Sequence, residues 1–156
     1  MTPAINLLNK TRTAHQVHEY QHDAAHTSYG LEAAEKMAVP AEQVFKTLVA
    51  EIDRSRLVVA ILPVSSTLNL KQLARAAGGK KAIMAEPALV ERTTGYVLGG
   101  VSPLGQKKLL PTFLDSSARE FDSIYVSAGR RGLEISLSPD ALLTLLKGQS
   151  VDLANP

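Results

Sequence analysis

The chain has 156 residues, 45% of them hydrophobic, and its seventeen basic and fifteen acidic residues give a net charge of +2, which is too small for a general nucleic-acid coat. The absence of Cys excludes a disulfide framework, a thiolate nucleophile and a zinc site with Cys ligands. No apolar run approaches the ~18 residues that span a bilayer, and the N-terminus has no secretory signal pattern. We therefore expect one domain over residues 1–156, in the cytoplasm and with no membrane partner.

The elements alternate irregularly along the chain. The first half predicts a helix at 3–10, an alternating stretch at 14–20, a helix at 31–37, and strands at 44–50 and 56–63. The middle of the chain predicts a helix at 69–78, a strand at 81–84, a helix at 86–92, and strands at 96–98 and 109–114. A short helix at 115–120 follows, and then a hairpin in which 123–127 pairs with 133–137 across a turn at 128–132. A final helix extends to 147, and we expect residues 149–156 to be frayed. About seven strands mixed with short helices predict a mixed α/β (α+β) fold around a curved sheet.

Lys46 stands out within the apolar run 44–50. Strand alternation places it on one face with Val44 and Leu48, whereas Thr47 lies on the other face. A lysine on an apolar face either extends to solvent along its long stem or reaches into a cleft, where burial gives it a chemical role. The pattern leaves both interpretations open.

Four of the ten glycines lie between residues 95 and 105, and Gly99 and Gly100 are adjacent. Adjacent glycines leave the backbone bare, so a ligand can approach two successive N–H groups. Such paired donors suit an anion or the oxygen of a reacting carbonyl, and Ser102 adds a hydroxyl nearby. The structural alternative is a strand with a glycine kink followed by a turn.

All four histidines lie within residues 15–26, at spacings of three and four residues: His15, His18, His22 and His26. On a helix this spacing would place them on one face, where they could bind a metal. The surrounding residues favour a strand and a loop instead, in which the rings diverge. No HExxH pattern accompanies them, and no GxSxG motif supports a Ser/His/Asp triad. We therefore expect no metal and no cofactor.

Three motifs in this order resemble the YbaK/EbsC family, which comprises free-standing relatives of the editing domain of bacterial prolyl-tRNA synthetases: VFKTL (44–48), TGYVLGGVSPLGQKK (94–108) and VSAGRRGLEI (126–135). The resemblance extends from Thr2 to Pro139. It implies a twisted mixed sheet, partly closed like a barrel and flanked by helices. It also implies a trans-editing hydrolase that cleaves the ester of a misacylated tRNA(Pro), which is Cys-tRNA(Pro) in the YbaK branch. Family members are thought to work without a protein nucleophile, with the substrate's own thiol assisting.

The resemblance also implies roles for single residues. Catalytic roles fall on the family's lysine and on the glycine pair of its substrate loop: Lys46, Gly99 and Gly100. Substrate-binding roles fall on four further residues: Tyr20, Thr47, Ser102 and Glu134. Members of the family often carry Asp where this chain has Glu134, which keeps the charge on a longer side chain.

Three basic doublets are candidate contacts to the tRNA backbone: Lys80-Lys81, Lys107-Lys108 and Arg130-Arg131. Such doublets also occur as ordinary solvated surface, and the sequence does not separate the two. Two other functions stay open: a non-catalytic module that binds a tRNA end or nucleotide, and a deacylase specific for Ala-tRNA(Pro). A metal hydrolase built on the histidines is a third alternative, which the sequence disfavours. Whether prolyl-tRNA synthetase is a partner besides misacylated tRNA(Pro) is open too.

Overall fold

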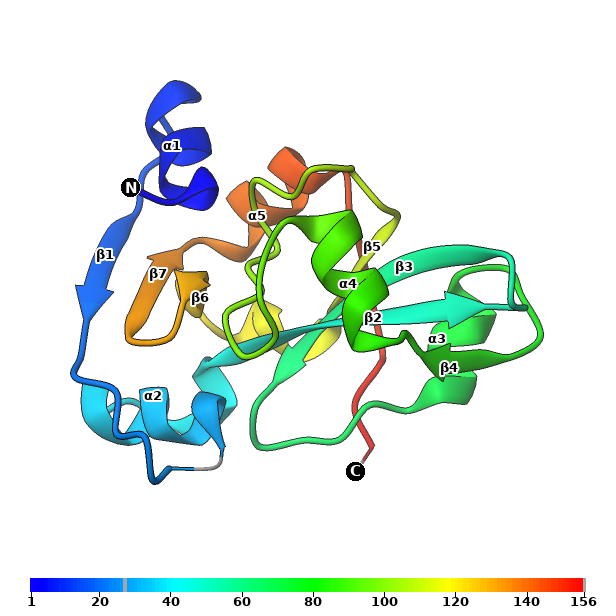
Figure 1. The fold of residues 1–156 in the computed structure, drawn as a ribbon, viewed down its shortest axis with the longest axis horizontal. Helices are drawn as coiled ribbons and strands as arrows, with labels where there is room; N and C mark the ends of the chain where they lie inside the picture. Colours follow the sequence, from blue (N-terminus) through cyan, green and yellow to red (C-terminus); the bar gives the residue numbers. More distant parts are fainter. Residues whose placement is uncertain (27, 156) are drawn as a thin grey trace.

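The computed structural model describes residues 1–26 and 28–155 (Figure 1). In chain order the elements are α1 (Pro3–Lys10), β1 (Gln16–Glu19), α2 (Tyr29–Met37), η1 (Ala41–Gln43), β2 (Phe45–Ile52), β3 (Arg56–Pro63), α3 (Leu70–Ala76), β4 (Ala82–Met84), α4 (Pro87–Thr94), β5 (Thr112–Asp115), η2 (Ser116–Glu120), β6 (Ile124–Arg130), β7 (Leu133–Leu137), α5 (Pro139–Leu146) and β8 (Gln149–Val151). No helix within these ranges has the length and apolar content that a membrane crossing requires.

The strands of the described ranges form two sheets. The smaller sheet is antiparallel, with the order β1-β7-β6, and the larger one is mixed, with the order β4-β2-β3-β5-β8. In the larger sheet β2 pairs antiparallel with β3 and β4, whereas β5 runs parallel to β3 and β8. A parallel bridge between Val44 and Tyr125 joins the start of β2 to β6. The two sheets therefore meet where β2 begins.

The two faces of β3 explain why its sequence is apolar throughout. Val58 and Ala60 pack on one side with residues of α3, whereas Val59 and Ile61 pack on the other side with residues of α1, α4 and α5. A strand that is buried on both faces reads as a continuous apolar run rather than an alternating one. The larger core cluster also contains Ile135 of β7, so it lies between the two sheets.

Local capping residues begin several of the predicted helices. Side-chain oxygens accept hydrogen bonds from backbone N–H groups in the first turn: Thr2 from Ile5, Asn69 from Gln72, and Ser138 from Ala141. A proline follows the cap in α1 and α5. These caps confirm the helices predicted at 3–10, 69–78 and 138–147, with boundaries within two residues.

The structure qualifies the prediction of one curved, partly barrel-like sheet. The mixed class is confirmed, but the strands divide into two sheets, and neither closes on itself. The strand predicted at 96–98 is also wrong, because this segment belongs to a loop that folds onto itself. There the Tyr96 hydroxyl donates to the Leu104 carbonyl oxygen at 2.6 Å, while Val97 is 68% exposed.

Residues 149–155 are ordered rather than frayed, and the last residue of the predicted stretch 149–156 lies outside the described residues. Residues 149–151 form β8 and pair with β5, and Leu153 is fully buried. The carboxylate of Asp115 holds this segment, since its Oδ1 accepts from the N–H groups of Leu153 at 2.7 Å and Ala154 at 3.0 Å. These long-range contacts leave no periodic pattern in residues 149–156, which is why the sequence prediction failed there.

Candidate active site

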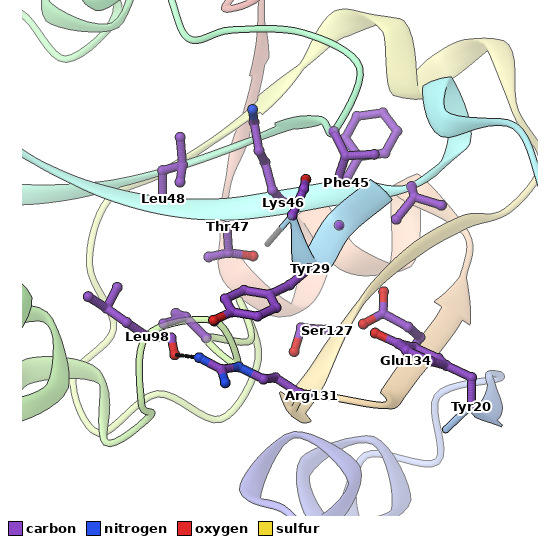
Figure 2. Close-up of a pocket in the computed structure, with 16 residues that line it drawn as sticks. Tyr20, Tyr29, Phe45, Lys46, Thr47, Leu48, Leu98, Ser127, Arg131 and Glu134 are labelled. Atoms are coloured by element: carbon purple, nitrogen blue, oxygen red, sulfur yellow. Dashed lines mark hydrogen bonds between the residues drawn. The ribbon is translucent and has the colours of Figure 1, made fainter. Parts of the chain in front are cut away.

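A pocket of about 300 Å³ opens near the junction of the two sheets (Figure 2). Its walls come from β2, the start of α2, the glycine-rich loop after α4, and the β6–β7 hairpin. The pocket brings together six of the predicted site residues: Tyr20, Lys46, Thr47, Gly99, Arg131 and Glu134. It adds others that the sequence did not single out, notably Tyr29 and Ser127.

Lys46 reaches the pocket from β2, where it lies opposite Leu62 of β3. Its Nζ donates to the Ser66 carbonyl oxygen at 2.6 Å, and desolvation by burial lowers the pKa of the ammonium. Figure 2 shows that the side chains of Lys46 and Thr47 leave β2 on opposite sides. Because an ammonium has three N–H donors and Ser66 takes one, Lys46 can still bind a ligand.

The hydroxyl of Thr47 is buried and has no hydrogen-bond partner among the described residues. Figure 2 shows it on the side of β2 that faces the Tyr29 ring. A buried hydroxyl without a partner costs about 1–3 kcal/mol, so it is retained only where something repays that cost. A polar ligand group in the pocket would give Thr47 its missing hydrogen bond.

Glu134 contributes a carboxyl group from β7, beside Tyr20 (Figure 2). The residue is 6% exposed, and it has no ion-pair partner among the described residues. Burial raises the pKa of Glu134 to about 8. Burial, and then the charge of Glu134, also raise the pKa of the Tyr20 phenol. A cationic ligand group would compensate this buried carboxylate and drive its ionisation.

The two adjacent glycines play different parts. Gly99 has φ +88°, and a Cβ there would lie 2.7 Å from Cε2 of Tyr29 and 2.8 Å from Nε of Arg131. Its N–H has no acceptor among the described residues. The N–H of Gly100, by contrast, donates to the Val97 carbonyl oxygen at 2.9 Å. The expectation of two free donors is therefore wrong at Gly100, whereas the Gly99 N–H is free to bind a ligand.

Close packing explains why position 100 is a glycine. A Cβ on it would lie 2.9 Å from the Cα of Arg130, so the loop sits directly against the backbone of the β6–β7 hairpin. Ser102 also lies outside the pocket. It is fully buried, and its Oγ accepts from the N–H of Leu104 at 3.2 Å, which stabilises the loop rather than the ligand site.

Arg131 and Tyr29 close one side of the pocket. The guanidinium carbon lies 3.8 Å from the centroid of the Tyr29 ring, a cation–π contact, and Nη2 donates to the Leu98 carbonyl oxygen at 3.5 Å (Figure 2). Arg131 thus lines the ligand pocket, although the sequence suggested it only as part of a basic doublet. The sequence near Tyr29 does not predict that it lines the pocket, because its contact there is with Arg131, about a hundred residues away in the chain.

The other basic residues are dispersed. The backbone N–H groups of Lys80 and Lys81 bind the carboxylate of Asp53 at 3.0 and 2.8 Å, and both side chains are exposed. Arg130 is exposed at the end of β6, and Lys107 and Lys108 line a second cavity. Each doublet therefore contacts different neighbours, and among the described residues neither the pocket nor the second cavity is lined by members of two doublets.

The histidines do not converge, as the strand-and-loop interpretation predicts. Each ring contacts a different neighbour: His15 the Thr13 carbonyl oxygen, His18 the Ser136 hydroxyl, His22 the Glu32 carboxylate, and His26 the Glu35 carboxylate. Within the described ranges no group of three His, Asp or Glu side chains is arranged to hold a metal ion. Glu32 is fully buried and accepts from His22 and from the N–H of Asp23 at 2.7 Å, which ties segment 20–26 to α2 beside the pocket.

The described lining of the pocket includes two basic residues, one buried carboxyl group, one unpartnered hydroxyl and the free N–H of Gly99, with the Lys46 side chain on the opposite side of β2 from the Thr47 hydroxyl. Convergent polar groups in a partly apolar cavity are typical of a site for a small polar ligand. A backbone donor beside cations also suits an oxygen that gains negative charge during a reaction. The pocket thus has the features of a site for a small ligand carrying charges of both signs.

The chain belongs to the aminoacyl-tRNA editing domain family, whose sequence signature matches residues 22–145. It is 38% identical over 152 residues to EbsC of Enterococcus faecalis, a candidate Cys-tRNA(Pro)/Cys-tRNA(Cys) deacylase, covering 97% of this chain and 92% of EbsC. It is 28% identical over 111 residues to the uncharacterized protein YwhH of Bacillus subtilis, covering 71% and 70%. The resemblance to the YbaK/EbsC family is therefore confirmed.

A solved structure supports the same assignment. The crystal structure of a candidate trans-editing enzyme for prolyl tRNA synthetase superposes with a TM-score of 0.84 at 26% identity, covering 99% of this chain and 98% of the other. The fold class predicted for the family is thus confirmed over nearly the whole chain.

Proposed function

We propose that residues 1–156 act as one trans-editing domain that hydrolyses the ester of misacylated tRNA(Pro), with Cys-tRNA(Pro) as the preferred substrate. Membership of the editing-domain family supports the reaction class. The observation that carries the proposal is the charge arrangement of the pocket, in which the uncompensated carboxyl of Glu134 lines the same small cavity as Lys46 and Arg131. An aminoacyl-adenosine end carries a cationic amino group and an anionic phosphate, so its charges match this arrangement.

The binding mode follows from these charges. The α-ammonium of the aminoacyl group pairs with the Glu134 carboxylate. Arg131 and Lys46, whose side chains lie on opposite sides of β2, bind the ribose and the phosphate of the terminal nucleotide. The Thr47 hydroxyl gains the hydrogen bond that it lacks in the free protein. Tyr20 lies beside Glu134 and contacts the aminoacyl group.

The Gly99 N–H polarises the ester carbonyl and stabilises the oxyanion that forms when the carbonyl carbon is attacked. Water attacks that carbon, the bond to the ribose oxygen breaks, and the leaving oxygen takes the proton that the water releases. The products are the free amino acid and the tRNA with its hydroxyl restored. With a cysteinyl ester, the substrate's own thiol is the alternative nucleophile. It attacks the same carbon, the bond to the ribose oxygen breaks as that oxygen takes the thiol proton, and water then opens the cyclic thioester to give free cysteine. No histidine is among the described residues that line the pocket, so no protein nucleophile–histidine pair is invoked.

The proposed substrate places the protein in the cytoplasm, where tRNA is aminoacylated, and makes prolyl-tRNA synthetase a candidate partner. The decisive experiment measures single-turnover release of amino acid from cysteinyl-, alanyl- and prolyl-tRNA(Pro), with and without chelator. We expect cysteinyl-tRNA(Pro) to be cleaved fastest, prolyl-tRNA(Pro) to survive, and chelator to have no effect. Faster cleavage of alanyl-tRNA(Pro) would reassign the specificity, and tight binding without any release would identify a non-catalytic module.

The role of Glu134 has its own test. Acetylation of the substrate's α-amino group removes the cation that Glu134 is proposed to bind. The wild-type protein should cleave the acetylated ester at least about tenfold more slowly than the free-amine ester, as expected when an interaction with a charged group is lost. In the Glu134→Gln variant the two esters should be cleaved at similar rates. An undiminished preference for the free amine in that variant would remove Glu134 from the binding mode.

A further inference from the structure

A second cavity, of about 640 Å³, lies beside the tip of the β2–β3 hairpin, where α4 and segment 107–111 also line it; these elements can be followed in Figure 1. Five exposed cationic side chains line it, and we call it the basic groove: Arg54, Arg56, Arg92, Lys107 and Lys108. Glu51 is the one carboxylate among the described residues that line the groove. The groove thus carries much more positive charge than the nearly neutral chain as a whole.

The positive charge of the groove is not neutralised within the described part of the chain. The ion pairs found there, within 4.0 Å, all involve α2 and none involves a groove residue. Cations brought together from three separate segments repel one another, and a bound anion relieves that repulsion. The Arg56 guanidinium donates to the Ala77 carbonyl oxygen, but an arginine has five N–H donors and keeps others for a ligand.

The turn of the β2–β3 hairpin directs Asp53 and Arg54 to different neighbours. Asp53 and Arg54 both adopt left-handed backbone angles, φ 51° and 55°, which non-glycine residues rarely do. The Asp53 carboxylate accepts from the backbone N–H groups of Lys80 and Lys81 and does not line the groove. Arg54 does line the groove, and the Asp53 carboxylate does not neutralise its charge there. The strained turn thus keeps an acidic neighbour out of the groove.

The groove lies at the base of the loop whose tip forms the ester pocket. The N–H of Lys107 donates to the Thr94 carbonyl oxygen at 3.0 Å, and the Lys107 stem packs 3.1 Å from the Cβ position of Gly95. These contacts close the loop 95–106, of which Leu98 and Gly99 line the pocket. Two residues of β2 line the two cavities, Lys46 the ester pocket and Glu51 the basic groove. Five residues of extended strand separate them by roughly 17 Å.

We infer that the basic groove binds the sugar-phosphate backbone of the RNA several nucleotides away from the ester that occupies the pocket. Three arginines can bind phosphates with two parallel hydrogen bonds each, and the lysines add point charges. Leu57 and Leu109, the latter 57% exposed, offer apolar contact to riboses between the cations. Cations that line a concave groove fit a narrow chain of regularly spaced charges better than the surface of an acidic protein. The inference rests on the proposed function only for the choice of tRNA as the RNA.

The test uses deacylated tRNA, so that its outcome does not depend on hydrolysis. Fluorescence anisotropy measures the dissociation constant at several salt concentrations for the full chain and two variants of equal charge. The groove variant combines Arg92→Gln, Lys107→Gln and Lys108→Gln. The control variant combines Lys10→Gln, Lys71→Gln and Arg119→Gln, which are exposed cations outside the groove. Circular dichroism verifies that both variants are folded.

The groove variant should weaken tRNA binding about tenfold and lower the slope of log affinity against log salt by about 2, whereas the control should change the affinity less than about twofold. Equal losses in both variants would overturn the inference, because binding would then follow net charge alone. An unchanged tRNA affinity together with lost binding to prolyl-tRNA synthetase would also overturn it and make the groove a protein-binding surface. Groove-dependent tRNA binding by a protein that cleaves no ester would refute the proposed function and leave this inference standing.

Discussion

Replacing Glu134 by Gln should abolish a large part of the pH dependence of stability. The pKa of Glu134 is raised by burial to about 8 from an ordinary 4.5, so between these pH values the folded protein holds a proton that the unfolded chain releases. Because the native state binds more protons in this window, the free energy of unfolding falls as pH rises from 4.5 to 8. Gln keeps the shape of the protonated acid and does not titrate.

The magnitude follows from the size of the shift. One pKa unit corresponds to about 1.4 kcal/mol, so the carboxyl's contribution to the free energy of unfolding should fall by ~4 kcal/mol between pH 5 and pH 8.5. Well below pH 4.5 the carboxyl is protonated in both states, and wild type and variant should have nearly equal stability. At pH 8.5 the variant should be the more stable protein, because it buries no charge.

Urea unfolding followed by circular dichroism, at half-unit steps from pH 5 to 9, measures this difference directly. The comparison of wild type with Glu134→Gln isolates the one carboxyl, since all other titrating groups are shared. Glu120→Gln, which changes an exposed acid in η2, is the matched control and should leave the pH profile unchanged. Parallel profiles for wild type and Glu134→Gln would refute the reasoning, because they would mean that Glu134 titrates alike in both states.

Three further substitutions test the pocket. Lys46→Ala should keep the circular dichroism spectrum and lower single-turnover deacylation about 10- to 100-fold, because a charged contact is lost. Lys46→Arg should restore the rate only partly, and Lys71→Ala is the exposed control. A normal rate in Lys46→Ala would make Lys46 a packing residue. Thr47→Val should raise the free energy of unfolding by about 1 kcal/mol, because a buried hydroxyl without a partner is removed, while deacylation falls; lower stability would mean that the hydroxyl is satisfied in the free protein. Gly99→Ala should displace Arg131 from Tyr29 and reduce deacylation about tenfold or more, measured beside thermal melting, and full activity would exclude the Gly99 N–H from the mechanism.

Some features of the site could be predicted from residues close together in the sequence. Lys46 is visible because a lysine interrupts an apolar run, and Gly99 because two glycines are adjacent. The difference between Gly99 and Gly100 could not be predicted, since it depends on the turn bond to Val97 and on the backbone of Arg130. Ser102 also looked like a site residue, yet its hydroxyl serves the loop itself.

By itself, the sequence determined most of the elements and the family. Caps such as Thr2 and Ser138 act on N–H groups three residues away, and the run of β3 is apolar because both of its faces are buried, so these signals are local and readable. The tertiary structure alone decided the division into two sheets, the pairing of β8, the pairing of Arg131 with Tyr29, and the assembly of the basic groove. Each of these depends on residues far apart in the chain that meet only after folding. Whether a carboxyl such as Glu134 has a counter-ion, or a hydroxyl such as Thr47 a partner, is likewise a property of the packed interior and not of its neighbours in sequence.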